Sequence, residues 1–584
     1  MVRVKLELLS QGVVAMRFSG KSRAVDDAER SSALLAPSCE FDHRSGQWTF
    51  PLQYLVDVGK VLQKYADKVS VSPNVVKAFR LQRKVARIVC ALQAKPTSFF
   101  PAAPYEAIFK AECMPHPYQR QGVAIMLAAK RLLLADSVGL GKTIQSVAAI
   151  AMALKSGVCR RAMVVTGASL KGQWREEALK YLQPDAIEGL ADGFAVIGGD
   201  RSKRLEAYNN PANRVLVLNY ELFLHDLRIM PPVGMVFLDE AARIKSLDAK
   251  TTQNIKVYCA KHRVRYRYAL TATAIENRLE DFFSILLFLN DRSLGFHTYF
   301  VYHYCKLRQF RAPNGRRIRQ VIGHLNLDEA KRRTAHVLLR RTKDDVGTEL
   351  PELIVRNVAV NLGPLQRRKY EQVKVEAKDP DSDLDPLQRS RLLREVCDSL
   401  ALVESGATES AKLDELEYFV RNVIGPDHSL VIFTQWRRMA KLIVERLADC
   451  YEQRPRVISG QVKSQDRDRH RQDFNEEKYR CLVMTDAGKA GLNLQACETM
   501  VNFELPWNPA TLKQRIGRMH RAGQQHKVTT VVNFITNNTI EHRVAERLMR
   551  RHRVFDTVLT AAEDELQAMD FSRTLTTRDL MELA

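Results

Sequence analysis

Short β-branched runs alternate with longer stretches of helical spacing from about residue 110 onward, and this alternation restricts the possible folds most strongly. The runs have the length of strands buried on both faces. Strands that alternate with helices form parallel sheets of βαβ units. One series of runs comprises residues 131–135, 162–166, 214–218, 235–238 and 268–271, and a second comprises residues 430–434, 456–459, 481–485, 499–503 and 529–534. We therefore expect an α/β protein with two parallel-sheet domains of similar architecture.

The N-terminal region has a different pattern. Apolar and charged residues alternate over residues 2–8, as in a strand with one buried face. Residues 41–50 predict a strand, a turn and a second strand, and residues 52–66 have helical spacing. We interpret this region as a small α+β module, followed by a linker around Pro101 and Pro104.

A charged, mainly helical region is expected at residues 280–410, between the two series of strands. Inside it, Asn314-Gly315 is a pair favoured in tight hairpin turns. Basic residues flank this pair, and they fit two alternatives: a hairpin that holds a nucleic acid, or a basic loop exposed to solvent. The flanking residues are Lys306, Arg308, Arg311, Arg316, Arg317 and Arg319. Residues 540–562 also have helical spacing and could brace the domains. The expected parts are residues 1–105, 106–352, 353–545 and 546–584.

The charge balance indicates a polyanionic partner. The chain has 584 residues, with 90 Lys and Arg against 67 Asp and Glu, a net charge of +23. On this charge, nucleic acid is favoured over an anionic membrane surface. No run approaches the ~20 apolar residues of a membrane span. The ten cysteines include no C-x-x-C pair, so we expect neither zinc nor disulfides, and an intracellular location.

A glycine-rich segment, residues 136–143, follows a predicted strand and opens a predicted helix. Glycines at Gly139 and Gly141 would let backbone N–H groups approach a phosphate chain. Lys142 would neutralise the β- and γ-phosphates, and the Thr143 hydroxyl would help to hold Mg²⁺. Asp136 replaces the first glycine of the usual motif, and an ordinary glycine turn before a helix is the alternative.

An apolar run ends in two carboxylates, Asp239 and Glu240. Ligands of parallel sheets bind at the carboxyl ends of the strands, so these acids should face the glycine-rich loop. We expect Asp239 to hold Mg²⁺ and Glu240 to orient and deprotonate the attacking water of ATP hydrolysis. A solvated acidic turn is the alternative.

A third motif, residues 514–521, carries arginines at three-residue spacing, which predicts one shared helical face. Facing the first domain, Arg518 and Arg521 could stabilise the charge that spreads on the γ-phosphate during hydrolysis. A basic helix on a solvated surface would show the same spacing.

Nine segments resemble, in order, those of the Swi/Snf-type branch of helicase superfamily two, over about residues 114–548. They are residues 117–122, 169–174, 219–221, 239–245, 270–277, 339–346, 487–494, 507–509 and 520–524. The resemblance implies two tandem RecA-like domains with helical insertions, and a DNA-stimulated ATPase that uses ATP and Mg²⁺. It implies that Gln119 and Gln514 contact the nucleotide. It also implies nucleic-acid contacts from Ser169, Trp174, Arg243, Lys245, Gly488, Gly491, Asn493 and Trp507.

Three residues depart from the family pattern. Ala242 stands in place of histidine, Ala272 in place of glycine and Ala274 in place of proline. These positions belong to segments that couple hydrolysis to DNA movement in the family, so the departures concern coupling and not phosphate chemistry.

The N-terminal module is similar, over residues 41–52, to the recognition repeat of annealing helicases that act at forked DNA. An exposed hairpin whose Trp48 covers a small core explains the same residues and is favoured.

Together these patterns predict an ATP-dependent translocase on double-stranded or forked DNA that remodels DNA or DNA-bound proteins, associated with a bacterial nucleoid or a nucleus. A strand-separating or annealing helicase, an RNA-dependent ATPase and a non-catalytic DNA-binding scaffold are the alternatives.

Overall fold

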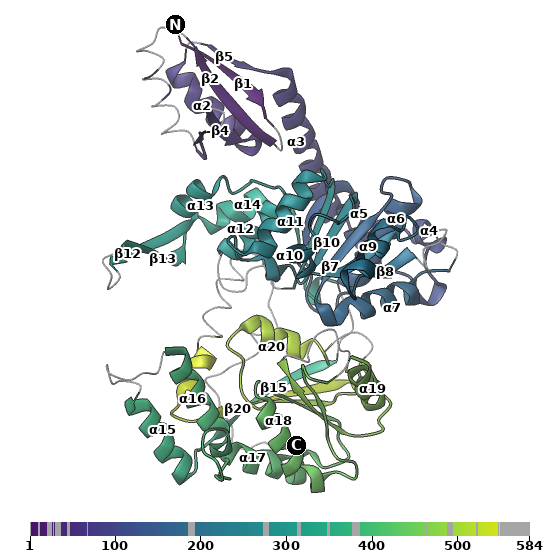
Figure 1. Cartoon of the computed structure of the whole chain (residues 1–584), viewed down its shortest axis with the longest axis vertical. Helices are drawn as coiled ribbons and strands as arrows, with labels where there is room; N and C mark the ends of the chain where they lie inside the picture. The colour runs from purple at the N-terminus through teal and green to yellow at the C-terminus, as the bar shows by residue number, and fades with distance from the viewer. Residues whose placement is uncertain are drawn as a thin grey trace. The chain divides into compact units, whose positions relative to one another are not determined.

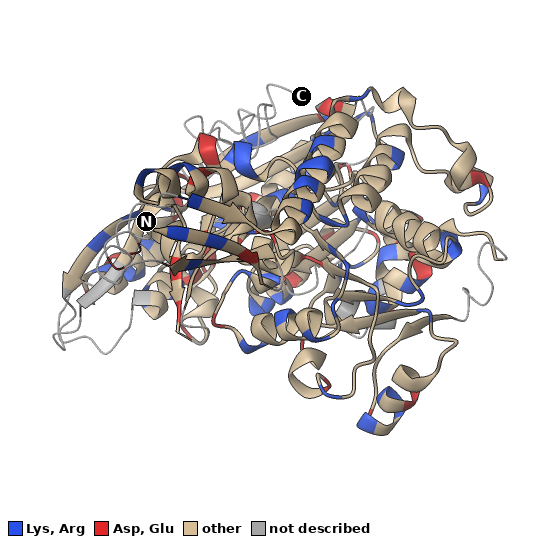
Figure 2. Ribbon diagram, turned by 90° about the horizontal axis from the view of Figure 1, so that it is seen from above, with Lys and Arg blue, Asp and Glu red and all other residues tan. Residues whose placement is uncertain are grey.

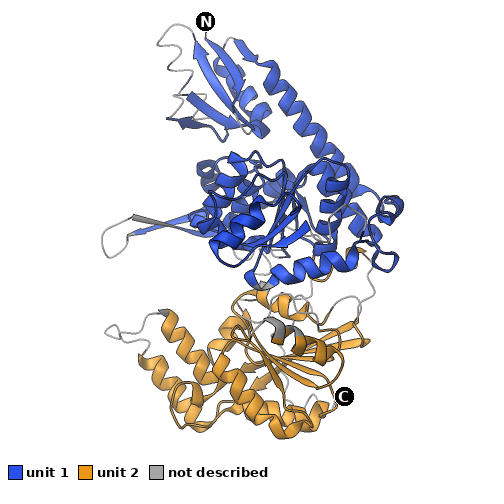
Figure 3. Cartoon of the chain, turned by 45° about the vertical axis from the view of Figure 1, so that its right-hand side comes forward, with its two compact units in different colours: residues 1–136, 141–341, 557–560 blue, residues 137–140, 342–556, 561–584 orange. Residues whose placement is uncertain are grey.

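The computed structural model describes residues 2–9, 12–19, 26, 29, 37–43, 47–66, 68–184, 193–272, 279–311, 317–346, 351–376, 386–462, 464–486, 494–520, 524–546 and 548. The chain divides into two compact units, shown in separate colours in Figure 3, and each is described by itself. The first consists mainly of Met1–Asp136 and Gly141–Arg341, and the second mainly of Thr342–Asp556 together with the short segment Ser137–Leu140. The expected helix at residues 540–562 is helical as far as residue 546, and most of the expected C-terminal part lies outside the described residues.

The N-terminal module is a five-stranded sheet of order β3-β4-β2-β1-β5 with two helices (Figure 1). It is the predicted small α+β module, although strands β2 and β5 were missed. Its alternating pattern places Val4 and Leu6 in the core and leaves Lys5 exposed. The expected linker follows a long helix, α3, that the sequence analysis did not identify. The elements are β1 (Arg3–Leu8), β2 (Val13–Ser19), β3 (Glu40–Asp42), β4 (Gln47–Pro51), α2 (Leu55–Tyr65), β5 (Lys68–Val71) and α3 (Pro73–Ala94).

The first α/β domain has a seven-stranded sheet of order β14-β6-β11-β10-β7-β9-β8, in which every pair is parallel. All five predicted strands are present, and the short strands β8 and β14 were missed. The strands are β6 (Arg131–Leu134), β7 (Ala162–Thr166), β8 (Phe194–Val196), β9 (Val215–Asn219), β10 (Met235–Asp239), β11 (Tyr266–Leu270) and β14 (Leu338–Leu339). Its helices include α4 (Ala103–Glu106), α5 (Pro117–Ala129), α6 (Lys142–Lys155), α7 (Lys171–Tyr181), α9 (Arg201–Asn209), α10 (Leu222–His225) and α11 (Lys250–Lys261).

A helical insertion with a projecting hairpin belongs to the same unit (Figure 1). The predicted hairpin is confirmed by antiparallel pairing of β12 (Cys305–Arg311) with β13 (Arg317–His324). Its predicted turn at Asn314-Gly315 lies outside the described residues. The insertion's helices are α12 (Leu279–Phe288), α13 (His297–Tyr304) and α14 (Leu327–Thr334).

The second unit has a six-stranded sheet of order β15-β20-β19-β16-β18-β17, again parallel throughout. The five predicted strands are present, and β15 was missed. The strands are β15 (Glu352–Val360), β16 (Leu430–Thr434), β17 (Arg456–Ile458), β18 (Cys481–Thr485), β19 (Thr499–Asn502) and β20 (Val528–Thr536). The helices are α15 (Pro364–Glu376), α16 (Pro386–Asp398), α17 (Ala411–Phe419), α18 (Arg437–Arg446), α19 (Ser464–Asn475) and α20 (Pro509–Ile516).

The predicted α/β class with two parallel sheets is therefore confirmed. Lys and Arg are spread over many helices and strands, as Figure 2 shows. No helix in the described part of the chain is long and apolar enough to cross a membrane.

Candidate functional site

The glycine-rich loop joins β6 to α6. Gly139 and Gly141 have φ values of 93° and 70°, in the left-handed region that favours glycine. Gly141 caps α6, which begins at Lys142. A Cβ atom on Gly141 would lie 2.5 Å from Nε2 of Gln119, so the close approach of that side chain also requires glycine. The helix N-terminus and the loop amides form a site suited to phosphate.

Lys142 lies among carboxylates at the start of α6. Its ammonium group donates to the carbonyl oxygen of Asp136 at 2.7 Å. Burial lowers the pKa of Lys142, and the negative charges of Asp136, Glu240 and Asp239 act in the opposite direction. The lysine and the acidic pair therefore lie at the same edge of the sheet, as the sequence predicts for the ends of parallel strands.

The carboxylate of Asp239, at the end of β10, is held firmly. Its Oδ2 accepts hydrogen bonds from Thr166 Oγ1 at 2.9 Å and from Trp174 Nε1 at 2.8 Å. The Tyr220 hydroxyl donates to the Asp239 carbonyl oxygen at 2.6 Å. Glu240 follows with φ of 53°, a left-handed conformation that is costly for a residue with a side chain. The strand end thus holds the Asp239 carboxylate in a fixed position and places Glu240 directly after it in a sharp turn.

The donor set fits Mg²⁺ held together with a nucleotide. The described residues contain no group of three or more His, Cys, Asp or Glu side chains that could hold a metal ion alone. Mg²⁺ is usually bound through one or two carboxylates, with phosphate oxygens and waters as the other ligands. Asp239, with the Thr143 hydroxyl from the first turn of α6, matches that requirement.

Gln119, the predicted adenine contact, lies on α5 beside the loop and is buried. Its Oε1 accepts from the backbone N–H of His116 at 2.9 Å, and its Nε2 donates to the Tyr118 hydroxyl at 3.2 Å. These bonds fix the orientation of the amide. The His116 and Tyr118 rings stack, with centroids 5.8 Å apart, at the same end of the helix.

Asp136, which replaces the usual glycine, forms a buried ion pair with Arg341. The Arg341 Nε donates to Asp136 Oδ1 at 3.0 Å, and its Nη2 donates to Asp136 Oδ2. Gln145, on α6, donates to Oδ2 of the same carboxylate at 3.0 Å. The loop is therefore tied to the last residue of the first unit before the chain enters the second. Sequence reasoning missed this ion pair. Its one signal in the sequence was the carboxylate of Asp136 at a position where the motif usually has glycine.

The arginine motif of the second unit differs from the predicted shared helical face. Helix α20 ends at Ile516, so Arg518 lies in the turn that follows. Arg521 lies outside the described residues, and Gln514 is half-buried on α20. Arg515, assigned no role from the sequence, is fully buried. It forms two hydrogen bonds to the Asp486 carboxylate, at 3.0 and 2.9 Å.

The predicted nucleic-acid contacts include residues of the first unit, one residue described in the second unit, and residues outside the described part. In the first unit Arg243 and Lys245 are exposed, with Arg243 3.4 Å from the Glu221 carboxylate. Trp174 is only 3% exposed and offers little surface to a nucleic acid; its indole contacts Asp239 instead.

Ser169 lies in the turn Ala168–Leu170. Trp507 in the second unit is half-buried, with the Arg394 guanidinium 5.2 Å from its ring. The predicted residues outside the described part are Gly488, Gly491 and Asn493.

Comparison with known proteins gives two adjoining family matches. A model of the SNF2-related domain matches residues 118–409. A model of the helicase conserved C-terminal domain matches residues 411–523. Both parallel sheets and every predicted nucleotide contact lie within or beside these ranges.

Among curated proteins, YwqA of Bacillus subtilis, which carries the name ATP-dependent helicase/translocase, is 29% identical over 490 residues, covering 80% of this chain and 50% of its own length. CHROMATIN REMODELING 5 of Arabidopsis thaliana is 27% identical, covering 74% of this chain and 26% of its own. The DNA repair and recombination protein RAD54B of Mus musculus is 24% identical, covering 74% of this chain and 54% of its own length. The chain thus spans about half the length, or less, of these relatives.

Among solved structures, the Sulfolobus solfataricus SWI2/SNF2 ATPase core in complex with dsDNA is 25% identical. The match covers 78% of this chain and 95% of that chain, with a TM-score of 0.36.

Proposed function

The chain belongs to the SNF2-related family, and from this premise we propose that it is a DNA-dependent ATPase that moves along double-stranded DNA. The observation that carries the proposal is the convergence of Lys142, Asp239 and Glu240 at one edge of the first sheet. A cation at a helix N-terminus beside two carboxylates is the arrangement needed to bind and hydrolyse a nucleoside triphosphate.

Each residue has a distinct role in the proposed reaction. Lys142 binds the β- and γ-phosphates, and Thr143 and Asp239 would hold Mg²⁺, which would neutralise charge on those phosphates. Glu240 orients the attacking water and accepts its proton. Gln119 contacts the base, and Gln514 contacts the nucleotide from the second unit. Arg518 and Arg521 stabilise the charge on the γ-phosphate as it is transferred.

The proposed nucleic-acid partner follows from charge and from the family. A net charge of +23 favours a polyanion, and the exposed Arg243 and Lys245 lie a few residues after the acidic pair. Contacts to phosphates carry little sequence information, which suits an enzyme that must step along any sequence. The proposed substrate is therefore duplex or forked DNA, free or with a bound protein, and the proposed location is the chromosome.

The test is the steady-state ATPase rate of the full chain with no nucleic acid, long duplex DNA, forked DNA or single-stranded RNA at equal salt. We expect duplex DNA to stimulate hydrolysis most, and the stimulation to fall steeply with salt. Greater stimulation by RNA would reject a DNA motor. Stimulation by forks alone, with release of a displaced strand, would favour the strand-separating alternative.

A further inference from the structure

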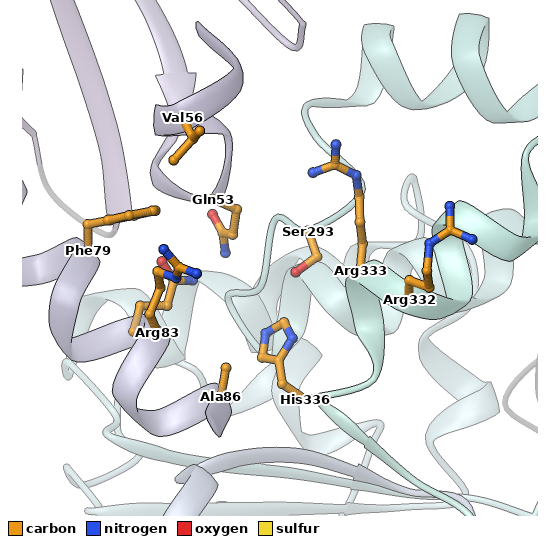
Figure 4. A pocket seen from close by; sticks show the side chains of 10 residues that line it. Gln53, Val56, Phe79, Arg83, Ala86, Ser293, Arg332, Arg333 and His336 are labelled. Carbon is orange, nitrogen blue, oxygen red and sulfur yellow. The ribbon is translucent and has the colours of Figure 1, made fainter. Parts of the chain in front are cut away.

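A cavity of about 560 Å³ lies where the N-terminal module meets the helical insertion (Figure 4). Phe79 and Arg83 of α3 line it from the module, and Ser293, Arg332 and His336 line it from the other side. Its volume is that of a typical site for a small organic ligand. All of its lining residues belong to the first unit, and none belongs to the nucleotide site described above.

The walls of this cavity are held together by specific contacts. The Tyr54 hydroxyl donates to the Ser293 carbonyl oxygen at 3.0 Å, and the backbone N–H of Phe296 donates to Ser38 Oγ at 2.7 Å. The Arg333 guanidinium lies 3.3 Å from the Asp57 carboxylate across the same junction. Module and insertion are therefore fastened at this point, and the cavity is a built feature of the unit.

The cavity has an excess of positive charge. Glu329 and Asp57 pair with Arg333, and Asp291 pairs with His336 at 3.0 Å. For Arg83, which is exposed on the module wall, the described residues provide no carboxylate within 4.0 Å. The guanidinium of Arg332, on the opposite wall, extends away from Arg83 (Figure 4). A guanidinium group and a buried hydroxyl on one cavity are suited to bind a phosphate group.

Buried polar atoms in the wall are left without protein partners. Ser293 is 2% exposed, and its backbone is fixed by Tyr54 and by the Asp291 carboxylate, which accepts its N–H at 2.9 Å. Among the described residues its hydroxyl has no hydrogen-bond partner, and the same holds for Oε1 of Gln82, another lining residue. Buried polar atoms are normally paired, so this hydroxyl and this acceptor are positions with which a bound molecule can form hydrogen bonds.

The ligand's remaining chemistry follows from the apolar wall. The Phe79 side chain and Val56 line the module side of the cavity. A flat aromatic group can pack against such a wall, while a donor on it reaches Gln82. We propose that this cavity binds a nucleoside phosphate, with its phosphate on Arg83 and the Ser293 hydroxyl. The nucleoside phosphate can be a free nucleotide or the 5′-phosphorylated end of a strand.

Binding is measured by fluorescence anisotropy at low salt with two probes, labelled dAMP and a labelled, 5′-phosphorylated dT8. Every protein is the full chain with Lys142→Ala, which weakens binding at the glycine-rich loop in all arms. We expect Arg83→Gln to weaken binding about tenfold or more, and Ser293→Ala about threefold. The matched control is Arg80→Gln, which changes an exposed residue on the same helix that does not line the cavity.

The two probes separate the possible sources of the ligand. Loss of dAMP binding alone assigns the cavity to a free nucleotide, and loss of dT8 binding alone assigns it to a strand end. Either result, or loss of both, supports the proposal. The proposal is overturned if neither probe binds the parent, or if the control variant loses as much affinity as the Arg83 variant.

Discussion

At the residue scale, the candidate site divides into parts that local sequence predicts and parts that it does not. Lys142, Asp239 and Glu240 could be predicted because a glycine loop before a helix and a strand ending in acids are local patterns. The partner of Asp136 could not, because Arg341 lies 205 residues further along the chain. The burial of Trp174 against Asp239 was missed for the same reason: only the fold brings them together.

Glu240 is the proposed base, and its substitution separates binding from hydrolysis. Glu240→Gln keeps the size of the side chain but removes the proton acceptor. We expect ATP affinity to change little and turnover to fall roughly 100-fold or more. Single-turnover hydrolysis and nucleotide binding are measured together, with the exposed Glu206→Gln as control. Near-normal turnover in Glu240→Gln would remove this residue from the chemistry.

The buried pair of Asp136 and Arg341 should dominate the stability of the loop. Asp136→Asn leaves the Arg341 charge buried without a counter-charge, because Asp136 is fully buried. We expect a loss of about 3–5 kcal/mol in the free energy of unfolding of the first unit. Urea denaturation measures it. The double variant with Asp136→Asn and Arg341→Met should recover part of this loss. If the double variant instead loses the sum of what Asp136→Asn and Arg341→Met lose singly, the pairing is contradicted.

Glu504 gives the second unit a defined pH dependence. Burial and the nearby Asp398 charge raise the pKa of Glu504 from 4.5 to about 8. The folded state therefore holds a proton that the unfolded state releases. This contribution to stability is complete below pH 4.5 and is lost as the pH rises through about 8.

Glu504→Gln keeps an amide oxygen to accept from the Gln435 N–H and removes the titration. The unfolding free energy of the variant, relative to the parent, should rise from pH 5 to pH 8.5. Urea denaturation across this range tests it, with the exposed Glu452→Gln as control. A constant difference would show that Glu504 does not titrate in this window.

At the element scale, the central strands could be predicted because they are continuous apolar runs. Strands β8 and β14 have only three and two residues, too few for a periodic pattern. Strand β15 carries polar residues and lies in a region whose charge predicts helices; its pairing with β20 stabilises it as a strand. The β12–β13 hairpin was predicted from turn chemistry, which is local.

The hairpin is the element whose role is easiest to isolate. Lys306 and Arg308 are exposed on β12. If the hairpin holds the duplex, Lys306→Gln with Arg308→Gln should weaken DNA binding about three- to tenfold at low salt and leave the DNA-free ATPase rate unchanged. The charge-matched control is Arg437→Gln with Lys441→Gln on α18. If both variants lose the same DNA affinity, the hairpin is only a solvated basic surface and does not hold the duplex.

At the scale of the whole molecule, two parallel-sheet domains could be predicted from two series of strands. The division expected after residue 352 stays a prediction, and the compact units of the structure change between Arg341 and Thr342. Strand β14 returns the chain to the first sheet just before that point, and two residues are too few to reveal this in the sequence.

The central claim is that hydrolysis at the Lys142 and Glu240 site moves the chain along a duplex. Release of a third strand from a DNA triplex tests it most directly, because a moving protein displaces that strand without separating the duplex. We predict ATP-dependent release by the parent chain and none by Glu240→Gln. Release that is equally fast without ATP, or in Glu240→Gln, would contradict the claim.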